Sequence, residues 1–119
     1  MLDPVIEYTH QEVGIAVVGG YVYRGQGIPG LDGHFVFADW TTGYAPPGNG
    51  TLLVATRVPP GQGLWQIQRL TIANSPSGRV DHFIQSLGQD ASGEIYLLTS
   101  SRSGPSGSTG EVFKVVPAQ

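Results

Sequence analysis

The segment Asp32-Gly33-His34-Phe35-Val36-Phe37 returns in outline sixty residues later as Ser92-Gly93-Glu94-Ile95-Tyr96-Leu97. Each copy is a turn that contains glycine, followed by an apolar run typical of a β-strand. Two further pairs of strand-like segments fit the same offset: Thr51–Ala55 with Glu111–Val115, and Tyr21–Arg24 with Asp81–Ile84. A fixed offset of this kind indicates an internal repeat, so we expect the chain to contain two copies of one structural unit.

Apolar residues that alternate between turn-forming segments predict an all-β fold. Strands are expected near 15–24, 34–40, 51–58, 65–72, 80–87, 94–100 and 111–117, with almost no helix. Four-stranded units repeated in series are typical of β-propeller blades. We therefore expect residues 1–119 to form a single two-blade unit, with blade one at about 15–72 and blade two at about 80–117. The N-terminal strand 5–10 is expected to supply the fourth strand of blade two.

The composition fits a chain that buries part of its surface against other protein. Only 13% of the residues are charged, about half the usual share, whereas 39% are hydrophobic. The net charge of −3 excludes a basic nucleic-acid footprint, and no apolar run is long enough to span a membrane. The absence of cysteine excludes disulfides and thiolate metal sites. The first residues have neither a basic nor an apolar segment, so no signal peptide is expected in this chain.

Two blades cannot close a propeller, because a ring needs about four to eight of them. An open pair leaves apolar faces and strand edges exposed. Three copies of a two-blade unit would form a six-bladed ring with cyclic symmetry. Either the chain is a piece of a longer protein or copies of it assemble, and we expect self-association into a homo-oligomer, with a trimer favoured.

Several stretches of the chain resemble the last blades of the glucose/sorbosone dehydrogenase family. The first is Gly19-Gly20-Tyr21-Val22-Tyr23-Arg24-Gly25, and the others are residues 28–39, 87–99 and 110–117. The propeller of hedgehog-interacting protein is similar over the same segment. The family consists of soluble PQQ-dependent sugar dehydrogenases with six-bladed propellers, usually periplasmic or secreted. The resemblance implies that this chain corresponds to about the last third of such a propeller.

The resemblance also implies where a cofactor would be held. In the family, the catalytic base and the calcium-associated residues come from earlier blades, and cations of the last blades contact PQQ. The positions of those cations fall near Thr41, Phe83 and Gln85, none of which is charged. A carboxylated quinone needs cations to offset its charge. We therefore expect no PQQ and no calcium on this chain, and assign it no catalytic, cofactor-binding or metal-binding residue.

A candidate ligand site lies at Asp39-Trp40-Thr41, where an apolar strand ends and a loop begins. An indole in this place can stack on a sugar face, and the neighbouring polar groups can bond its hydroxyls. The alternative is structural, with Trp40 packed beneath the loop and Asp39 paired with an arginine. Arg24 is expected to be a buried partner of Asp39 or Asp90.

Two other motifs are interpreted as structural. Residues 25–30 match G-x-G-x-x-G, but a dinucleotide site needs a helix directly after it, and here Pro29 and a strand follow. We therefore interpret this stretch as a loop between strands. Residues 90–93 are interpreted as an Asx-type turn.

Three functions follow from these observations. The first is a non-catalytic propeller module that assembles as a homo-oligomer. The second is a module that binds carbohydrate or another small molecule through Asp39, Trp40 and Thr41. The third is a fragment of an active PQQ-dependent sugar dehydrogenase, which would need the remaining blades for activity.

Overall fold

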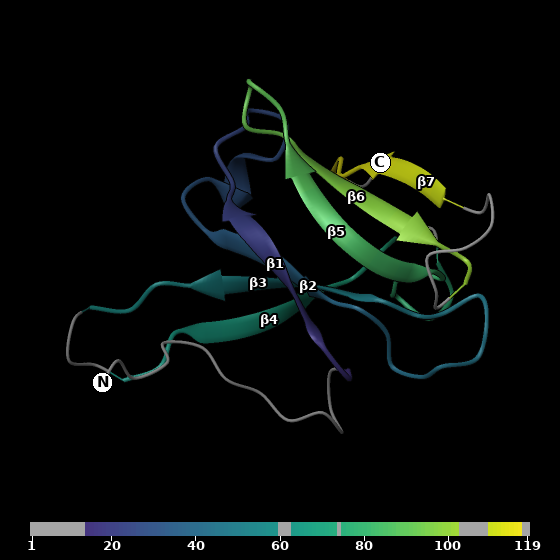
Figure 1. Cartoon of the computed structure of the whole chain (residues 1–119). Helices are drawn as coiled ribbons and strands as arrows, with labels where there is room; N and C mark the ends of the chain where they lie inside the picture. Colours follow the sequence, from purple (N-terminus) through teal and green to yellow (C-terminus); the bar gives the residue numbers. More distant parts are fainter. Residues whose placement is uncertain (1–13, 60–62, 74, 103–109, 118–119) are drawn as a thin grey trace.

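The chain folds into two antiparallel sheets that follow one another in sequence (Figure 1). The computed structural model describes residues 14–59, 63–73, 75–102 and 110–117. The first sheet contains four strands in sequence order, and the second contains three. The strands are β1 Val17–Val22, β2 Phe35–Asp39, β3 Thr51–Thr56 and β4 Gln66–Leu70, then β5 Phe83–Gln89, β6 Ile95–Ser100 and β7 Gly110–Lys114. Within each sheet, every strand pairs with its neighbour in the chain, which is the up-and-down arrangement of propeller blades.

The all-β prediction is confirmed. Each of the seven strands lies at a predicted position, and the only helical segment among the described residues is one 3-10 turn, η1, at Pro29–Leu31. No described helix is long and apolar enough to cross a membrane. The strand predicted at residues 5–10 lies outside the described residues, so its pairing with the second sheet stays a prediction.

The sixty-residue repeat is confirmed for the second and third strands of each sheet. Ala38 pairs with Leu52 in the first sheet, and Leu98 pairs with Val112 in the second, so both partners advance by 60. Side chains therefore alternate in the same phase along β2 and β6, and along β3 and β7. The second sheet repeats the register of the first without a slip.

The predicted alignment of Tyr21–Arg24 with Asp81–Ile84 is wrong. Val22 pairs with Phe35, and its counterpart Gln89 pairs with Ile95, so the first strands are separated by 67 residues. The difference arises because residues 23–34 join β1 to β2, whereas only residues 90–94 join β5 to β6. The longer connection holds the G-x-G-x-x-G stretch and η1. A constant offset between strands assumes loops of equal length, and these loops differ.

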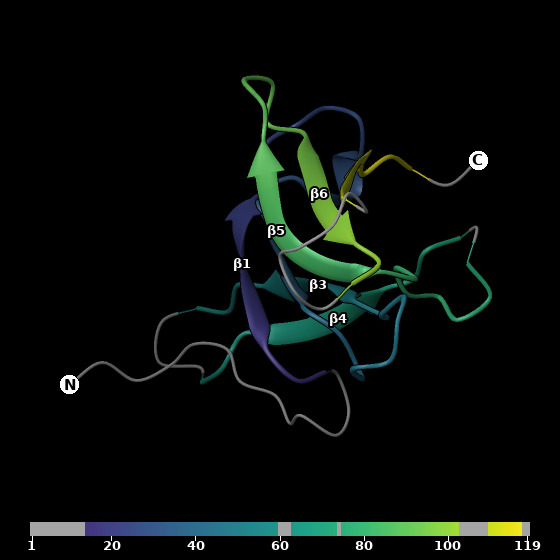
Figure 2. The ribbon, with the colours of Figure 1, turned by 45° about the vertical axis from the view of Figure 1, so that its right-hand side comes forward.

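The main hydrophobic core lies between the two sheets. β1 runs beside β5 (Figure 2). Side chains from both sheets meet in this core. The fully buried members are Tyr23, Val36, Ala38, Leu52, Val54, Ile84, Leu87, Ile95 and Leu97. A second, smaller cluster of Phe37, Leu53 and Ala55 lies on the opposite face of the first sheet. Both faces of the first sheet are therefore apolar, as expected of a blade with a neighbour on each side.

Leu52→Ala tests whether the two sheets unfold as one body. Leu52 is fully buried in the core that both sheets share, so its truncation is expected to lower the free energy of unfolding by about 2–5 kcal/mol. Both sheets are expected to unfold in a single urea-induced transition, monitored by circular dichroism, and the variant is expected to unfold at a lower urea concentration. Val17→Ala is the control, because Val17 is 64% exposed on β1 and its truncation leaves no cavity. Two separate transitions in the wild type would contradict a shared core.

Candidate functional site

Asp39 is the last residue of β2, and its side chain bonds the backbone at the start of the following loop. Its side chain is fully buried, and Oδ1 accepts hydrogen bonds from the backbone N–H groups of Ala16 (3.2 Å) and Thr41 (3.3 Å). The first bond reaches the segment before β1, and the second reaches across one residue within the turn. The carboxylate thus fixes where the chain leaves the first sheet.

Thr41 organises the loop that follows. Its hydroxyl donates to the carbonyl oxygen of Gly43 (2.7 Å) and accepts from the N–H groups of Asn49 (3.0 Å) and Gly43 (3.3 Å). Residue 41 is fully buried. The hydroxyl therefore joins the two ends of the loop between residues 41 and 49.

Trp40 connects this loop to the second sheet. Its ring is 5.3 Å from the ring of Phe83 and 5.7 Å from that of Tyr44, which meets it edge-on. The carbonyl oxygen of Trp40 also accepts the N–H of Ile84 (3.0 Å), so backbone and side chain both contact β5. Phe83 is fully buried, whereas Tyr44 is 65% exposed. The three rings form an aromatic row that leads from the surface into the junction of the sheets.

The structure brings the predicted site residues together in part. Asp39, Trp40 and Thr41 lie with Phe83 at one junction between the sheets, whereas Gln85 is exposed on β5. The expectation that Arg24 is buried against Asp39 or Asp90 is wrong, because Arg24 is exposed. The chain turns Tyr23 into the core, and alternation then directs the next side chain outward.

A second polar centre, at Glu94, was not predicted. Oε1 of Glu94 accepts the hydroxyl of Tyr23 (2.6 Å), and Oε2 accepts the N–H groups of Gln26 (3.1 Å) and Gly27 (3.0 Å). The Tyr23 hydroxyl in turn accepts the N–H of Ile28 (2.8 Å). Glu94 is only 8% exposed. The glycine-rich stretch thus binds a negatively charged group of the protein itself. This group is the Glu94 carboxylate in the second sheet's β5–β6 turn.

Two glycines make room for this contact. A β-carbon on Gly25 would come within 2.5 Å of the Glu94 carboxylate. Gly93 has a φ of +87°, and a β-carbon there would lie 2.6 Å from the carbonyl carbon of Arg24. Only glycine combines a positive φ with so close an approach of two backbones. The sequence signals for this contact were the glycines of 25–30 and the Gly93-Glu94 pair. Neither signal shows from the sequence that the two segments meet.

The predicted Asx-type turn at residues 90–93 is confirmed beside Glu94. Oδ1 of Asp90 accepts the N–H groups of Ser92 (2.9 Å) and Glu94 (3.0 Å), and Oδ2 accepts the hydroxyl of Tyr96 (2.9 Å). The Tyr96 hydroxyl is the main cause that lowers the pKa of Asp90. The Tyr23 hydroxyl is the main cause that lowers the pKa of Glu94, and the N–H of Gly27 adds to it. Both side chains are therefore carboxylates at neutral pH.

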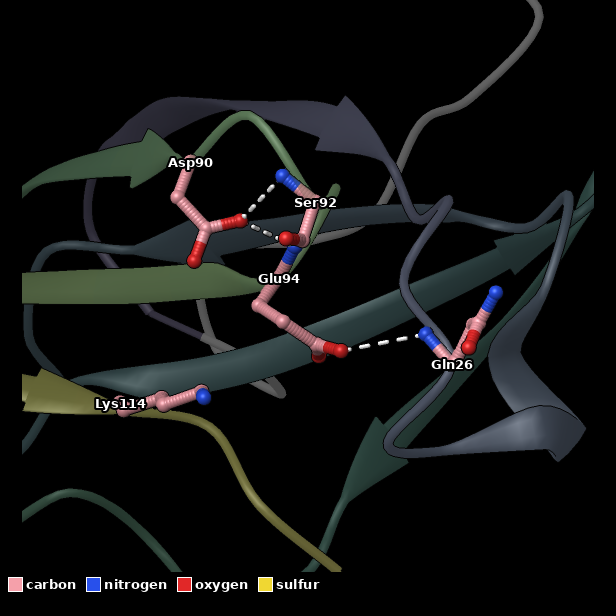
Figure 3. Close-up of a pocket in the computed structure, with 5 residues that line it drawn as sticks. All are labelled: Gln26, Asp90, Ser92, Glu94 and Lys114. Carbon is pink, nitrogen blue, oxygen red and sulfur yellow. Dashed lines mark hydrogen bonds between the residues drawn. The ribbon is translucent and has the colours of Figure 1, made fainter.

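A polar hollow of about 410 Å³ lies over these two carboxylates. Gln26, Asp90, Ser92, Glu94 and Lys114 line it. Figure 3 shows Glu94 reaching across to Gln26, with Lys114 of β7 on the other side. Within the described residues, no group of three histidine or acidic side chains is placed to hold a metal ion. The hollow is thus a surface feature above an internal contact between the sheets.

The fold and this junction define an all-β chain with two propeller-type sheets joined through a shared core. No family model matches the chain. It is 34% identical to hedgehog-interacting protein of Homo sapiens over 102 residues, which are 84% of this chain and 13% of that protein. The Mus musculus protein matches to the same extent, and HIPL1 protein of Arabidopsis thaliana is 30% identical over 109 residues.

These similarities are distant, and the chain spans only 13% to 16% of the length of these relatives. The similarity to hedgehog-interacting protein that the sequence motifs indicated is confirmed. The wider relationship to sugar dehydrogenases stays a prediction.

Glu94→Gln tests the contact between the sheets. The amide has one acceptor oxygen in place of two charged ones, so the variant is expected to unfold at lower urea concentration at pH 7. Because the pKa of Glu94 is held below its ordinary value of 4.5, its stabilising contribution is complete above pH 4.5. That contribution is lost as the pH falls through the lowered pKa of the folded state. The difference in the free energy of unfolding between the variant and the wild type should therefore become smaller as the pH is lowered.

Asp32→Asn is the matched control, since it removes the same charge from an exposed position in the β1–β2 connection. It is expected to leave the free energy of unfolding nearly unchanged. A Glu94→Gln effect that stays constant down to low pH would show that the carboxylate charge is not what stabilises the contact.

Proposed function

We propose that this chain is a two-blade propeller module derived from a PQQ-dependent sugar dehydrogenase-like protein. It has no catalytic activity alone and assembles as a homo-oligomer, with three copies favoured. The observation that carries the proposal is the apolar outer face of the second sheet, where Leu98 is 38% exposed and Val112 is 66% exposed. Paired apolar side chains of this kind on a sheet face mark a surface that meets another protein surface.

The absence of catalysis is supported by the residues at the positions that resemble the family's cofactor contacts. The Thr41 hydroxyl is held by three bonds to its own loop, and the buried ring of Phe83 packs on Trp40. Neither offers a cation to a carboxylated quinone, and Gln85 is neutral. These residues do not fit PQQ, so no redox step is assigned to the chain.

The preference for three copies rests on ring geometry. Each chain contributes two sheets that pack side by side through a shared core. Closed rings avoid open faces, and six blades are within the usual range for propellers. Three copies supply six blades, and cyclic symmetry then gives every copy the same contacts.

The mass in solution tests this assembly. Light scattering coupled to size-exclusion chromatography is expected to give three times the chain mass of 12.6 kDa at micromolar concentration. A different multiple would change the ring size and keep the self-association. A folded monomer at every concentration would overturn the proposal.

A second candidate function is carbohydrate binding at Asp39, Trp40 and Thr41. The exposed ring of Tyr44 favours it, because this ring stands edge-on to Trp40 at the outer end of the aromatic row. Exposed aromatic rings beside polar groups suit the alternating apolar and hydroxyl surfaces of sugars. Because the Asp39 and Thr41 side chains bond the loop backbone, they would act mainly by holding the rings in place.

Tyr44→Ala tests this candidate on a glycan array. If a glycan binds at the aromatic row, the variant is expected to bind it about two- to twelvefold more weakly, since one aromatic contact contributes about 0.5–1.5 kcal/mol. Tyr21→Ala is the control, because Tyr21 is also partly exposed but lies on β1 outside the loop. Glycan binding that is equal in both variants and the wild type would remove this site.

A further inference from the structure

Arg79 lies where the chain, after leaving β4, returns to the start of β3. Val80 forms an isolated bridge with Gly50 there, and the N–H of Val80 donates to the carbonyl oxygen of Gly50 (3.0 Å). The bridge places Arg79 opposite Thr51, and the Nε group of Arg79 donates a hydrogen bond to the Thr51 hydroxyl (2.9 Å). The fully buried Thr51 thereby fixes the half-buried guanidinium of Arg79 beside β3.

Arg69 of β4 carries a second guanidinium on the same face of the first sheet. It pairs directly with Leu53 of β3, which lies two residues after Thr51. Side chains two residues apart on a strand point to the same face, and residues directly opposite on neighbouring strands share that face. Two residues span about 7 Å along a strand, a separation that two arginine side chains can bridge. The two guanidiniums therefore stand near one another at the start of β3.

Among the residues that the structure describes, no carboxylate neutralises this pair. The side chain of Arg79 makes only its bond to Thr51, and the exposed Arg69 has neither a hydrogen bond nor an ion pair. Asp81, two residues after Arg79, instead accepts two serine hydroxyls (2.9 and 3.1 Å). Oδ1 of Asp39 on β2 accepts two backbone N–H groups. Burial, and after it the charge of Arg69, lower the pKa of Arg79, as expected of a cation without an anionic partner.

We propose that Arg69 and Arg79 form a binding site for a tetrahedral oxyanion, a phosphate or sulfate group. Each guanidinium offers several N–H donors in a planar fork, and a tetrahedral dianion has enough oxygens to accept from two forks at once. A carboxylate would occupy one fork and leave the other charge unpaired. The bond to Thr51 holds the fork of Arg79 in place before the anion binds, which reduces the entropy lost on binding.

Nuclear magnetic resonance of the isotope-labelled chain tests the site, with inorganic phosphate and inorganic sulfate as probes at constant ionic strength. The Nε–H signals of Arg69 and Arg79 are expected to shift together and to saturate with one dissociation constant for each anion. Chloride at the same ionic strength is expected to leave both signals unchanged. The Nε–H signal of Arg102, which is exposed after β6, is the internal control. Shifts that do not saturate, or that are equally large for Arg102, overturn the inference.

Variants that each remove one guanidinium test the two residues separately. Arg69→Gln and Arg79→Gln are each expected to weaken phosphate binding about tenfold, because each removes charge-assisted hydrogen bonds to the anion. Arg102→Gln is the matched control, since it removes the same charge from an exposed position and is expected to bind phosphate like the wild type. An equal loss of binding in all three variants would show that net charge alone attracts the anion, and would overturn the site.

Two further arms address folding and the source of the anion. Circular dichroism checks that each variant keeps its strand content, and if Arg79→Gln does not fold, Arg69→Gln at its exposed position still tests the site. Phosphoserine is then compared with inorganic phosphate on the wild type. Binding of phosphoserine as tight as that of inorganic phosphate supports a phosphate group carried on a larger molecule, and weaker binding supports the free ion. Failure of phosphate, sulfate and phosphoserine alike to bind overturns the inference.

Discussion

The carboxylate of Glu94 is the group on which the arrangement of the two sheets depends. A buried charge is costly unless donors replace its water, and here a phenol and two backbone N–H groups do so. Each donor lies in the connection after β1, while the acceptor lies just before β6. The contact therefore fixes the β1–β2 connection of the first sheet against the β5–β6 turn of the second. Glycine is required at both positions, because a β-carbon at Gly25 would clash with the Glu94 carboxylate and one at Gly93 would clash with the backbone of Arg24.

The repeat makes the two faces of each sheet different from each other. Side chains alternate in the same phase along β2 and β6. The two sheets therefore contact each other through unlike faces, because the face of the second sheet that enters the shared core corresponds to the face of the first sheet that points away from it. The two remaining faces are unlike: Phe37, Leu53 and Ala55 are buried on the first sheet, whereas Leu98 and Val112 are exposed on the second. The low share of charged residues fits this arrangement, because a blade between two neighbours has little surface for charge. Like-with-like packing would instead have shifted the register of the second unit by one residue.

Alternation and turn residues were enough to predict all seven described strands. Exposure alternates along β1 and β6, whereas the continuously buried strands β2 and β3 were recognisable as apolar runs between turn-rich segments. The offset of the first strands was wrong because loop length leaves no trace in strand periodicity. The contact of Glu94 with Tyr23 was missed for a related reason. The two residues are 71 positions apart, and Glu94 aligns with His34, which has no such role. The Asx-type turn was predictable because its donors and acceptor lie within four residues.

The contacts of Thr41 and Phe83 at the junction around Trp40 are structural. The resemblance places cation contacts to a cofactor near Thr41 and Phe83, and in this structure both side chains make contacts within the protein. The Thr41 hydroxyl closes a loop, and the Phe83 ring packs on Trp40 in the joint between the sheets. A cation at position 83 would lose its water beneath the indole, and only an anion brought by a ligand would offset that cost. The neutral ring of Phe83 packs on Trp40 in the joint between the sheets without that cost.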